Sequence, residues 1–213
     1  MQRRGFTAVE LPIVLGAVAL TAAFLGPVFS RSSDNARRAA CQSNLKQIGL
    51  GIAQYVQDYD ELYPRVSVHP VTTNVAPYSR TYGWADALYP YLRSVQVYQC
   101  PSDKRPPNRK GDAVKANFTD YWLNTHLSGV SMADISQYAT TISLGDGNDG
   151  RDMTNARYSK AALPTAWLRD ARSPARRHMD VGANYAFLDG HVKWLRTNEV
   201  MNYAGRKNSF LLK

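Results

Sequence analysis

The chain has 213 residues, of which 44% are hydrophobic, and a formal net charge of +9. This length allows one domain, or one domain with an extended appendage. The hydrophobic content is high enough for a packed core, which excludes a wholly disordered protein. The charge is uneven: residues 1–150 carry +2 and residues 151–213 carry +7. A basic surface predicts either binding to DNA or another anionic surface, or only good solubility.

A membrane-length apolar segment lies near the N-terminus. No residue from Leu11 to Phe29 is charged. Nineteen residues in an α-helix span about 28 Å, close to the thickness of a bilayer core. Glu10 stands directly before this run. Because a carboxylate in lipid is costly, an ionisable residue at such a place indicates a function.

The residues around Glu10 resemble the leader of type IV prepilins. A short basic leader ends at Gly5, and Phe6 follows it directly. The resemblance implies that a prepilin peptidase cleaves between Gly5 and Phe6 and methylates the new amine of Phe6. It also implies that Glu10 of one subunit meets this amine in the next subunit and sets the axial register of a filament.

Two alternatives to this interpretation remain open. The apolar run could be an ordinary secretory signal, with Ala17 to Ala19 as its A-x-A cleavage site. Against this, Glu10 would lie inside the apolar region, and the apolar run continues well beyond Ala19. The alternative for Glu10 is a carboxylate that only reaches the membrane interface near the start of a helix.

Four residues interrupt the apolar run, namely Pro12, Gly16, Gly26 and Pro27. A proline inside a helix removes a backbone hydrogen bond and kinks the axis. Pro12 replaces the leucine usual there in type IV pilins, which predicts a first turn that is not straight. The resemblance further implies that the segment from Gly16 to Pro27 stretches when subunits assemble.

Beyond Phe29 the pattern becomes amphipathic and predicts that the helix continues to about Asp60. Its apolar residues recur mostly three or four apart: Ala40, Cys41, Leu45, Ile48, Ile52, Tyr55, Val56, Tyr59 and Leu62. A helix from Phe6 to Asp60 would measure about 80 Å. One small domain cannot bury a rod of that length, so its apolar half needs lipid or other copies of the chain.

The chain has two cysteines, Cys41 and Cys100. In an exported protein an even pair favours a disulfide, because two thiolates alone do not complete the coordination shell of zinc. The alternative is two buried free thiols. In the chain-entropy model, closing a loop of this length contributes roughly 4 kcal/mol.

The rest of the chain, residues 62–213, is predicted to be a globular domain. Its first part is rich in proline and loops, with a short helix over Trp84–Leu92 and a strand over Val95–Tyr98. A second strand is predicted over residues 139–144. Two further strand-like runs flank Asp189 and Gly190, which predicts a hairpin with a type I′ turn and positive φ at both residues.

An acidic, glycine-rich loop is predicted directly after residues 139–144. Oxygen-rich loops of this kind suit Ca²⁺. The candidate ligands are Asp146, Asn148, Asp149 and Asp152. The spacing lacks the glutamate of an EF-hand, and the alternative is a solvated turn. We expect no other cofactor.

Four motifs in order resemble pilin-like proteins that carry a C-terminal H-X9-DG domain of the DUF1559 type. They are Gly5 to Glu10, Ser43 to Gly49, Pro90 to Asp103, and His178 to Asp189-Gly190-His191. The resemblance implies an α+β fold, in which a long N-terminal helix packs on a small antiparallel β-sheet. Ten residues rather than nine separate His178 from Asp189, which leaves the partners of His178 open.

We therefore predict four segments: a cleaved leader (1–5), a transmembrane or filament-core helix (6–30), its amphipathic continuation (31–61) and the globular domain (62–213). The predicted function is a subunit of a type IV pilus-like filament. It would reside in the inner membrane, with its C-terminal domain in the periplasm, and then be assembled at the cell surface by an assembly platform. The alternatives are a pseudopilin of type II secretion and a membrane-anchored protein that binds nucleic acid or glycan.

We do not expect an enzyme. His178, Asp180, Asp189 and His191 could be combined into a metal or acid–base site. However, Asp189 is accounted for by its turn. The P-loop, HExxH, GxSxG and CxxC motifs are all absent from the sequence.

Overall fold

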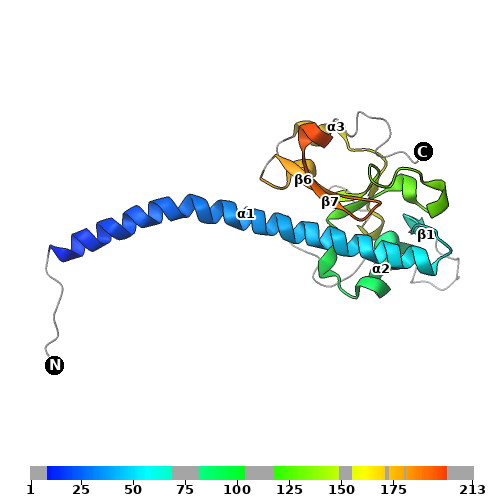
Figure 1. The fold of residues 1–213 in the computed structure, drawn as a ribbon, viewed down its shortest axis with the longest axis horizontal. Coiled ribbons are helices and arrows are strands. Elements are labelled where there is room, and N and C mark those ends of the chain that lie inside the picture. The colour runs from blue at the N-terminus through cyan, green and yellow to red at the C-terminus, as the bar shows by residue number, and fades with distance from the viewer. Residues whose placement is uncertain are drawn as a thin grey trace, which may run out of the picture. The chain divides into compact units, whose positions relative to one another are not determined.

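The computed structural model describes residues 9–68, 82–103, 118–148, 155–170, 173–179 and 181–200. The chain divides into two compact units, residues 1–36 and residues 37–213. The helices are α1 (Glu10–Asp58), α2 (Trp84–Leu92) and α3 (Thr165–Arg169), as Figure 1 shows. The α1 helix contributes residues to both units.

In the first unit, the apolar side chains of α1 are exposed. Phe24 is 73% exposed and Phe29 is 68% exposed. By length and composition, α1 is a helix that could cross a membrane. Pro12 lies in the first turn of α1, where a missing N–H breaks no helical hydrogen bond. The stretching predicted for residues 16–27 concerns an assembled filament and stays a prediction.

In the second unit, α1 is amphipathic as predicted. One face of the helix is buried in the core: Cys41, Leu45, Ile48, Ile52 and Val56. The predicted stripe extends too far, because Tyr59 and Leu62 are 53% and 38% exposed. The helix ends at Asp58, since Asp60 and Glu61 both adopt positive φ values.

A mixed five-stranded sheet forms the centre of the second unit, in the order β5-β3-β4-β6-β7. Its strands are β3 (Tyr121–Asn124), β4 (Ile142–Asp146), β5 (Ser159–Lys160), β6 (Gly182–Phe187) and β7 (Val192–Arg196). All neighbours are antiparallel except β3 and β5, which are parallel. A separate pair joins β1 (Ser67–Val68) to β2 (Tyr82–Gly83). The α+β class is confirmed, with a mixed rather than purely antiparallel sheet.

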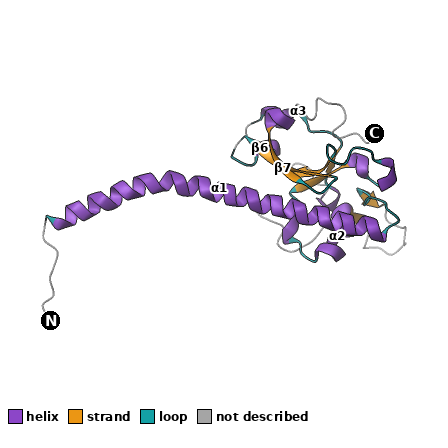
Figure 2. Cartoon of the chain, in the orientation of Figure 1, coloured by secondary structure: helices purple, strands orange, loops and turns teal. Residues whose placement is uncertain are grey.

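The three central strands of the sheet, β3, β4 and β6, are buried on both faces. Along β3, Tyr121 and Leu123 join the core cluster that contains the buried face of α1. Trp122, between them, joins a second cluster with Trp167 of α3. Helices on both sides of the strands, visible in Figure 2, explain why the central strands lack the polar alternation of a sheet with one face in water.

Two predictions for short segments have different outcomes. The predicted helix over Trp84–Leu92 is confirmed as α2. The predicted strand over Val95–Tyr98 is wrong, because residues Gln96–Tyr98 form a turn of 3₁₀-helix. The N–H of Tyr98 donates to the carbonyl of Val95, at 3.2 Å. A short apolar run fits a strand or a buried helical turn equally well, so hydrophobicity alone did not distinguish them.

The hairpin around Asp189 and Gly190 is confirmed, but its turn differs from the predicted type. Gly190 has a φ of +87°, whereas Asp189 has no positive φ. The N–H of Gly190 donates to the carbonyl of Phe187, at 3.0 Å. This pattern is that of a three-residue loop, in which a type I turn is followed by a left-handed glycine.

The strand predicted over 139–144 begins and ends later, as β4 (Ile142–Asp146). Gly145 therefore lies in a strand rather than in a loop. A Cβ atom at Gly145 would lie 2.4 Å from Cζ2 of Trp122, which explains the glycine by close packing.

Candidate functional site

The two cysteines form a disulfide in the interior of the second unit, as predicted. Cys41 lies on α1 and Cys100 lies after the 3₁₀-turn, with their Cα atoms 5.1 Å apart. Both residues are buried. The bond closes a loop across 59 positions of sequence and therefore ties the loop-rich segment to the helix.

Next to the disulfide, a polar side chain of α1 joins the helix to the sheet. The amide of Asn44 donates to the carbonyl of Gln99 at 2.9 Å and contacts the hydroxyl of Tyr121 at 3.3 Å. Burial, followed by the negative charge of Asp146, raises the pKa of Tyr121 well above its usual value. Apart from its place in the Ser43–Gly49 motif, no pattern in the sequence indicated this role of Asn44.

The histidine of the sequence motif, His178, lies in this same buried region. Its Nε2 is 2.8 Å from Oδ2 of Asp146 and 3.9 Å from Sγ of Cys100. Its Nδ1 is 3.2 Å from the hydroxyl oxygen of Ser102. His178 and Asp189 lie at opposite ends of β6, so the motif does not bring them into one site. Asp189 instead accepts the N–H of His191, at 3.1 Å.

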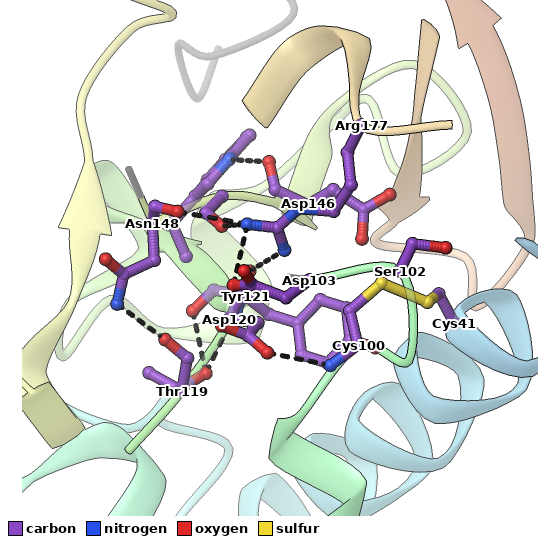
Figure 3. A network of polar contacts seen from close by, with 12 residues as sticks. Cys41, Cys100, Ser102, Asp103, Thr119, Asp120, Tyr121, Asp146, Asn148 and Arg177 are labelled. Atoms are coloured by element: carbon purple, nitrogen blue, oxygen red, sulfur yellow. Dashed lines mark hydrogen bonds and ion pairs between the residues drawn. A yellow bond between two sulfur atoms is a disulfide. The ribbon is translucent and has the colours of Figure 1, made fainter. Parts of the chain in front are cut away.

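Two of the predicted calcium ligands lie in the interior. Asp146 is fully buried at the end of β4, where its Oδ2 accepts the N–H of Asn184 at 2.7 Å. Asn148 is buried as well, and its side chain donates to the carbonyl of Thr119 at 2.9 Å, as Figure 3 shows. Asp149 and Asp152 lie outside the described residues, as do Gly5, Phe6 and Asp180. Calcium binding therefore stays a prediction.

An arginine with a largely buried side chain completes the network. Arg177 forms an ion pair with Asp103 at 3.3 Å and donates to the carbonyls of Asp120, Gly147 and Asn148 (Figure 3). The carboxylate of Asp120 accepts the N–H of Cys100, at 2.9 Å. The guanidinium thus connects the segment after the disulfide with the segment after β4.

This environment shifts the protonation of one carboxyl group. Burial raises the pKa of Asp120 to about 7, against the opposing effect of the Arg177 charge. A hydrogen bond with Asp103 and the negative charge of Asp103 raise it further, whereas the N–H of Cys100 lowers it. The lone aspartate at 120 had no motif around it, so sequence reasoning missed this group.

Ser102, His178 and Asp146 are connected in the order of a hydrolase triad, but the ring is reversed. Ser102 contacts Nδ1 and Asp146 contacts Nε2, whereas a serine hydrolase places its nucleophile on Nε2. The side chains of His178 and Asp146 have no exposed surface. The arrangement therefore leaves a substrate no approach to the imidazole.

A cavity of about 460 Å³ lies elsewhere in the second unit, between α1 and the hairpin. Its wall is mainly apolar and includes Leu50, Ala53, Val56, Met132 and Leu188.

Two of the basic side chains of this unit pack on an aromatic ring. The guanidinium of Arg38 lies over the ring of Trp194, 5.1 Å from its centroid, and Arg196 lies 6.0 Å from the same centroid.

The fold and the site define a protein with two parts. One is a disulfide-bonded α+β domain, and the other is an apolar N-terminal helix that could cross a membrane by its length and composition. Over residues 34–179, the chain matches the family described as "Protein of unknown function (DUF1559)", and it belongs to this family. No curated protein and no solved structure matches the chain. The match confirms the DUF1559 part of the resemblance and begins after the leader and the apolar run.

Proposed function

We propose that the chain is a structural subunit of a type IV pilus-like extracellular filament. It would enter the inner membrane as a prepilin, lose residues 1–5, and polymerise through the apolar part of α1. The family match is consistent with a pilin-like or pseudopilin-like protein. The globular domain would then cover the outside of the filament.

The observation that carries the proposal is the exposure of the first half of α1. An 18-residue window of this helix has a mean hydropathy of 2.1, and none of it is buried in the protein. Exposed apolar surface of this extent is unfavourable in water and needs lipid or protein around it. A membrane would supply this cover first, and neighbouring copies of α1 would supply it in the filament.

In this proposal, Glu10 sets the axial register between neighbouring subunits. It is the first residue of α1, where a carboxylate also favours the positive end of the helix dipole. Cleavage after Gly5 would create an amine at Phe6. An ion pair between this amine and Glu10 of a neighbour would offset the cost of holding the carboxylate in an apolar filament core.

The test combines processing with assembly. N-terminal sequencing of exported material should find Phe6 as the first residue, and replacing Gly5 should block leader removal. Glu10→Ala should leave membrane insertion intact and abolish fibres. Asp34→Ala is the matched control, because Asp34 is an exposed acid on the same helix outside the apolar run. Fibres of normal abundance from Glu10→Ala, or a mature N-terminus after Ala19, would refute the proposal.

A type II secretion pseudopilin would use the same helix in the same way. The two functions differ in the assembly that they form. Long surface fibres that mass spectrometry identifies as this chain would support the pilus. A short periplasmic assembly, with loss of protein secretion when the chain is deleted, would support the pseudopilin instead.

A further inference from the structure

Four side chains with metal-binding atoms converge at the disulfide, two of them its own cysteines. They are Cys41, Cys100, Asp146 and His178, and the ligand atoms of all four lie within 4.8 Å of one another. All four residues are buried, none more than 4% exposed. Cysteine sulfur, imidazole nitrogen and carboxylate oxygen are the three ligand types that zinc uses in proteins. The cysteines alone supply half a shell, and His178 and Asp146 supply the other half.

The distances suit a tetrahedral ion once the disulfide is open. In a zinc site with these ligands, neighbouring ligand atoms are about 3.4–3.8 Å apart. Sγ of Cys100 and Nε2 of His178 are already 3.9 Å apart. Nε2 of His178 and Oδ2 of Asp146, now 2.8 Å apart, would separate slightly as the ion enters between them. Side-chain rotation is enough for these changes, because the four backbones already surround one point.

Asp146 and His178 also show independent signs of a ligand role. Within the described part of the chain, Oδ1 of Asp146 is buried and has no hydrogen-bond partner. A buried carboxylate oxygen without a partner is unfavourable, and a cation would satisfy it. The hydroxyl of Ser102 contacts Nδ1 of His178, which leaves Nε2 directed at the cysteines. Such a contact on the far nitrogen is how proteins orient a metal-binding histidine.

We propose that the reduced chain binds one Zn²⁺ through Cys41, Cys100, Asp146 and His178, and that disulfide formation releases the ion. A newly made chain carries both cysteines as thiols. Binding Zn²⁺ displaces the two thiol protons to solvent and leaves two thiolates on the metal. A disulfide-donating thiol oxidase then takes up two electrons from these thiolates and two protons from solvent, as its own disulfide becomes a dithiol. The sulfur–sulfur bond forms and the ion leaves. This inference is independent of the filament proposal.

The site would keep the domain folded before oxidation. Without a disulfide, the loop-rich segment around Cys100 has lost its covalent tie to α1, and a shared metal ion restores that connection. The oxidised chain cannot bind the ion in the same way, because neither sulfur is then a thiolate.

The test uses the full chain in detergent micelles, reduced by a water-soluble phosphine under nitrogen. The phosphine is oxidised to phosphine oxide, takes its oxygen from water, and leaves two thiols. Co²⁺ is then titrated as a coloured substitute for Zn²⁺. We expect one ion per chain, with thiolate-to-cobalt charge-transfer absorption and the intense visible bands of a tetrahedral site, and loss of these bands when Zn²⁺ is added. The oxidised chain should give none of them.

Two variants test the ligands, and a third is the matched control. His178→Gln and Asp146→Asn should each weaken Co²⁺ binding at least about tenfold. His191→Gln should leave binding unchanged. His191 forms an exposed pair with Asp189, and this pair lies at the other end of β6 from His178. Circular dichroism follows folding in parallel. If the reduced chain unfolds, refolding on addition of Zn²⁺ supports the site. No uptake by the reduced wild-type chain, or equal uptake by His178→Gln, overturns the proposal.

Discussion

Replacing Asp120 with asparagine should change the pH dependence of stability. Asp120 is 6% exposed, and its carboxyl group interacts with the side chain of Asp103 and with the charge of Arg177. Asparagine has nearly the same shape, and its oxygen can still accept the N–H of Cys100 that Asp120 binds now. The substitution therefore removes the titration of the side chain with little change in packing.

The stability of the wild-type protein should fall as pH rises, because the pKa of Asp120 is higher in the folded chain than in the unfolded chain. In the folded protein, burial raises the pKa of Asp120 to about 7, whereas in an unfolded chain it is about 3.9. Between these values the folded state binds a proton that the unfolded state has lost, so wild-type stability falls as pH rises. At about 1.4 kcal/mol per pH unit over three units, the loss is at most about 4 kcal/mol. Below pH 4 and above pH 7 this contribution is constant.

Urea unfolding of both proteins, with the disulfide intact, measures this effect. The stability of Asp120→Asn relative to wild type should increase steadily from pH 4 to pH 7 and then level off. Asp134→Asn, at an exposed aspartate, is the control for a general loss of negative charge. A difference between Asp120→Asn and wild type that stays constant with pH, or that decreases as pH rises, would show that the reasoning is wrong.

The remaining predictions concern the disulfide and two glycines. Replacing Cys41 and Cys100 together with serine should lower the free energy of unfolding by about 4 kcal/mol, and a loss below about 1 kcal/mol in urea would contradict the loop-closure argument. Gly145→Ala should destabilise the protein by about 1–3 kcal/mol, because the new Cβ would lie 2.4 Å from a ring atom of Trp122. In Gly49→Ala the new Cβ atom would have no neighbouring atom within 4 Å, so this substitution should instead stabilise α1 by about 0.5–1 kcal/mol. Equal effects of the two glycine substitutions on the thermal midpoint would refute the packing argument.

Local patterns in the sequence were sufficient for the elements that depend on local periodicity. The buried face of α1 from Cys41 to Val56 follows a helical repeat, and the structure confirms it. The helix over Trp84–Leu92 and the hairpin around Gly190 were also predicted. In these cases the relevant interactions lie within a few residues of each other, so composition and spacing carry enough information.

Long-range packing decided the features that sequence reasoning missed. Val95–Tyr98 was predicted as a strand, but Tyr98 turns inward as part of a helical turn, and its hydroxyl donates to the carbonyl of Ala85 at 2.7 Å. The predicted loop at Gly145 is a strand because it pairs with residues 40 positions further along the chain. No local pattern encodes which distant segment will be the neighbour.

The partners of His178 also could not be predicted from local sequence. The sequence motif links His178 with Asp189, yet β6 separates them, and the contacts of His178 are with Asp146, Ser102 and Cys100. Each contact spans more than 30 positions of sequence.

The motifs that looked like separate signals in the sequence converge on one buried junction. Cys41 and Asn44 reach it from α1, Cys100 and Ser102 from the segment after the 3₁₀-turn, and His178 from the segment before β6. A junction of this kind fixes α1 to the sheet through covalent and polar contacts. In the proposed filament, force on the globular domain would reach α1 through this junction. Of the described residues that the sequence combined into a possible metal or acid–base site, His178 lies at this junction, whereas Asp189 and His191 lie at the other end of β6.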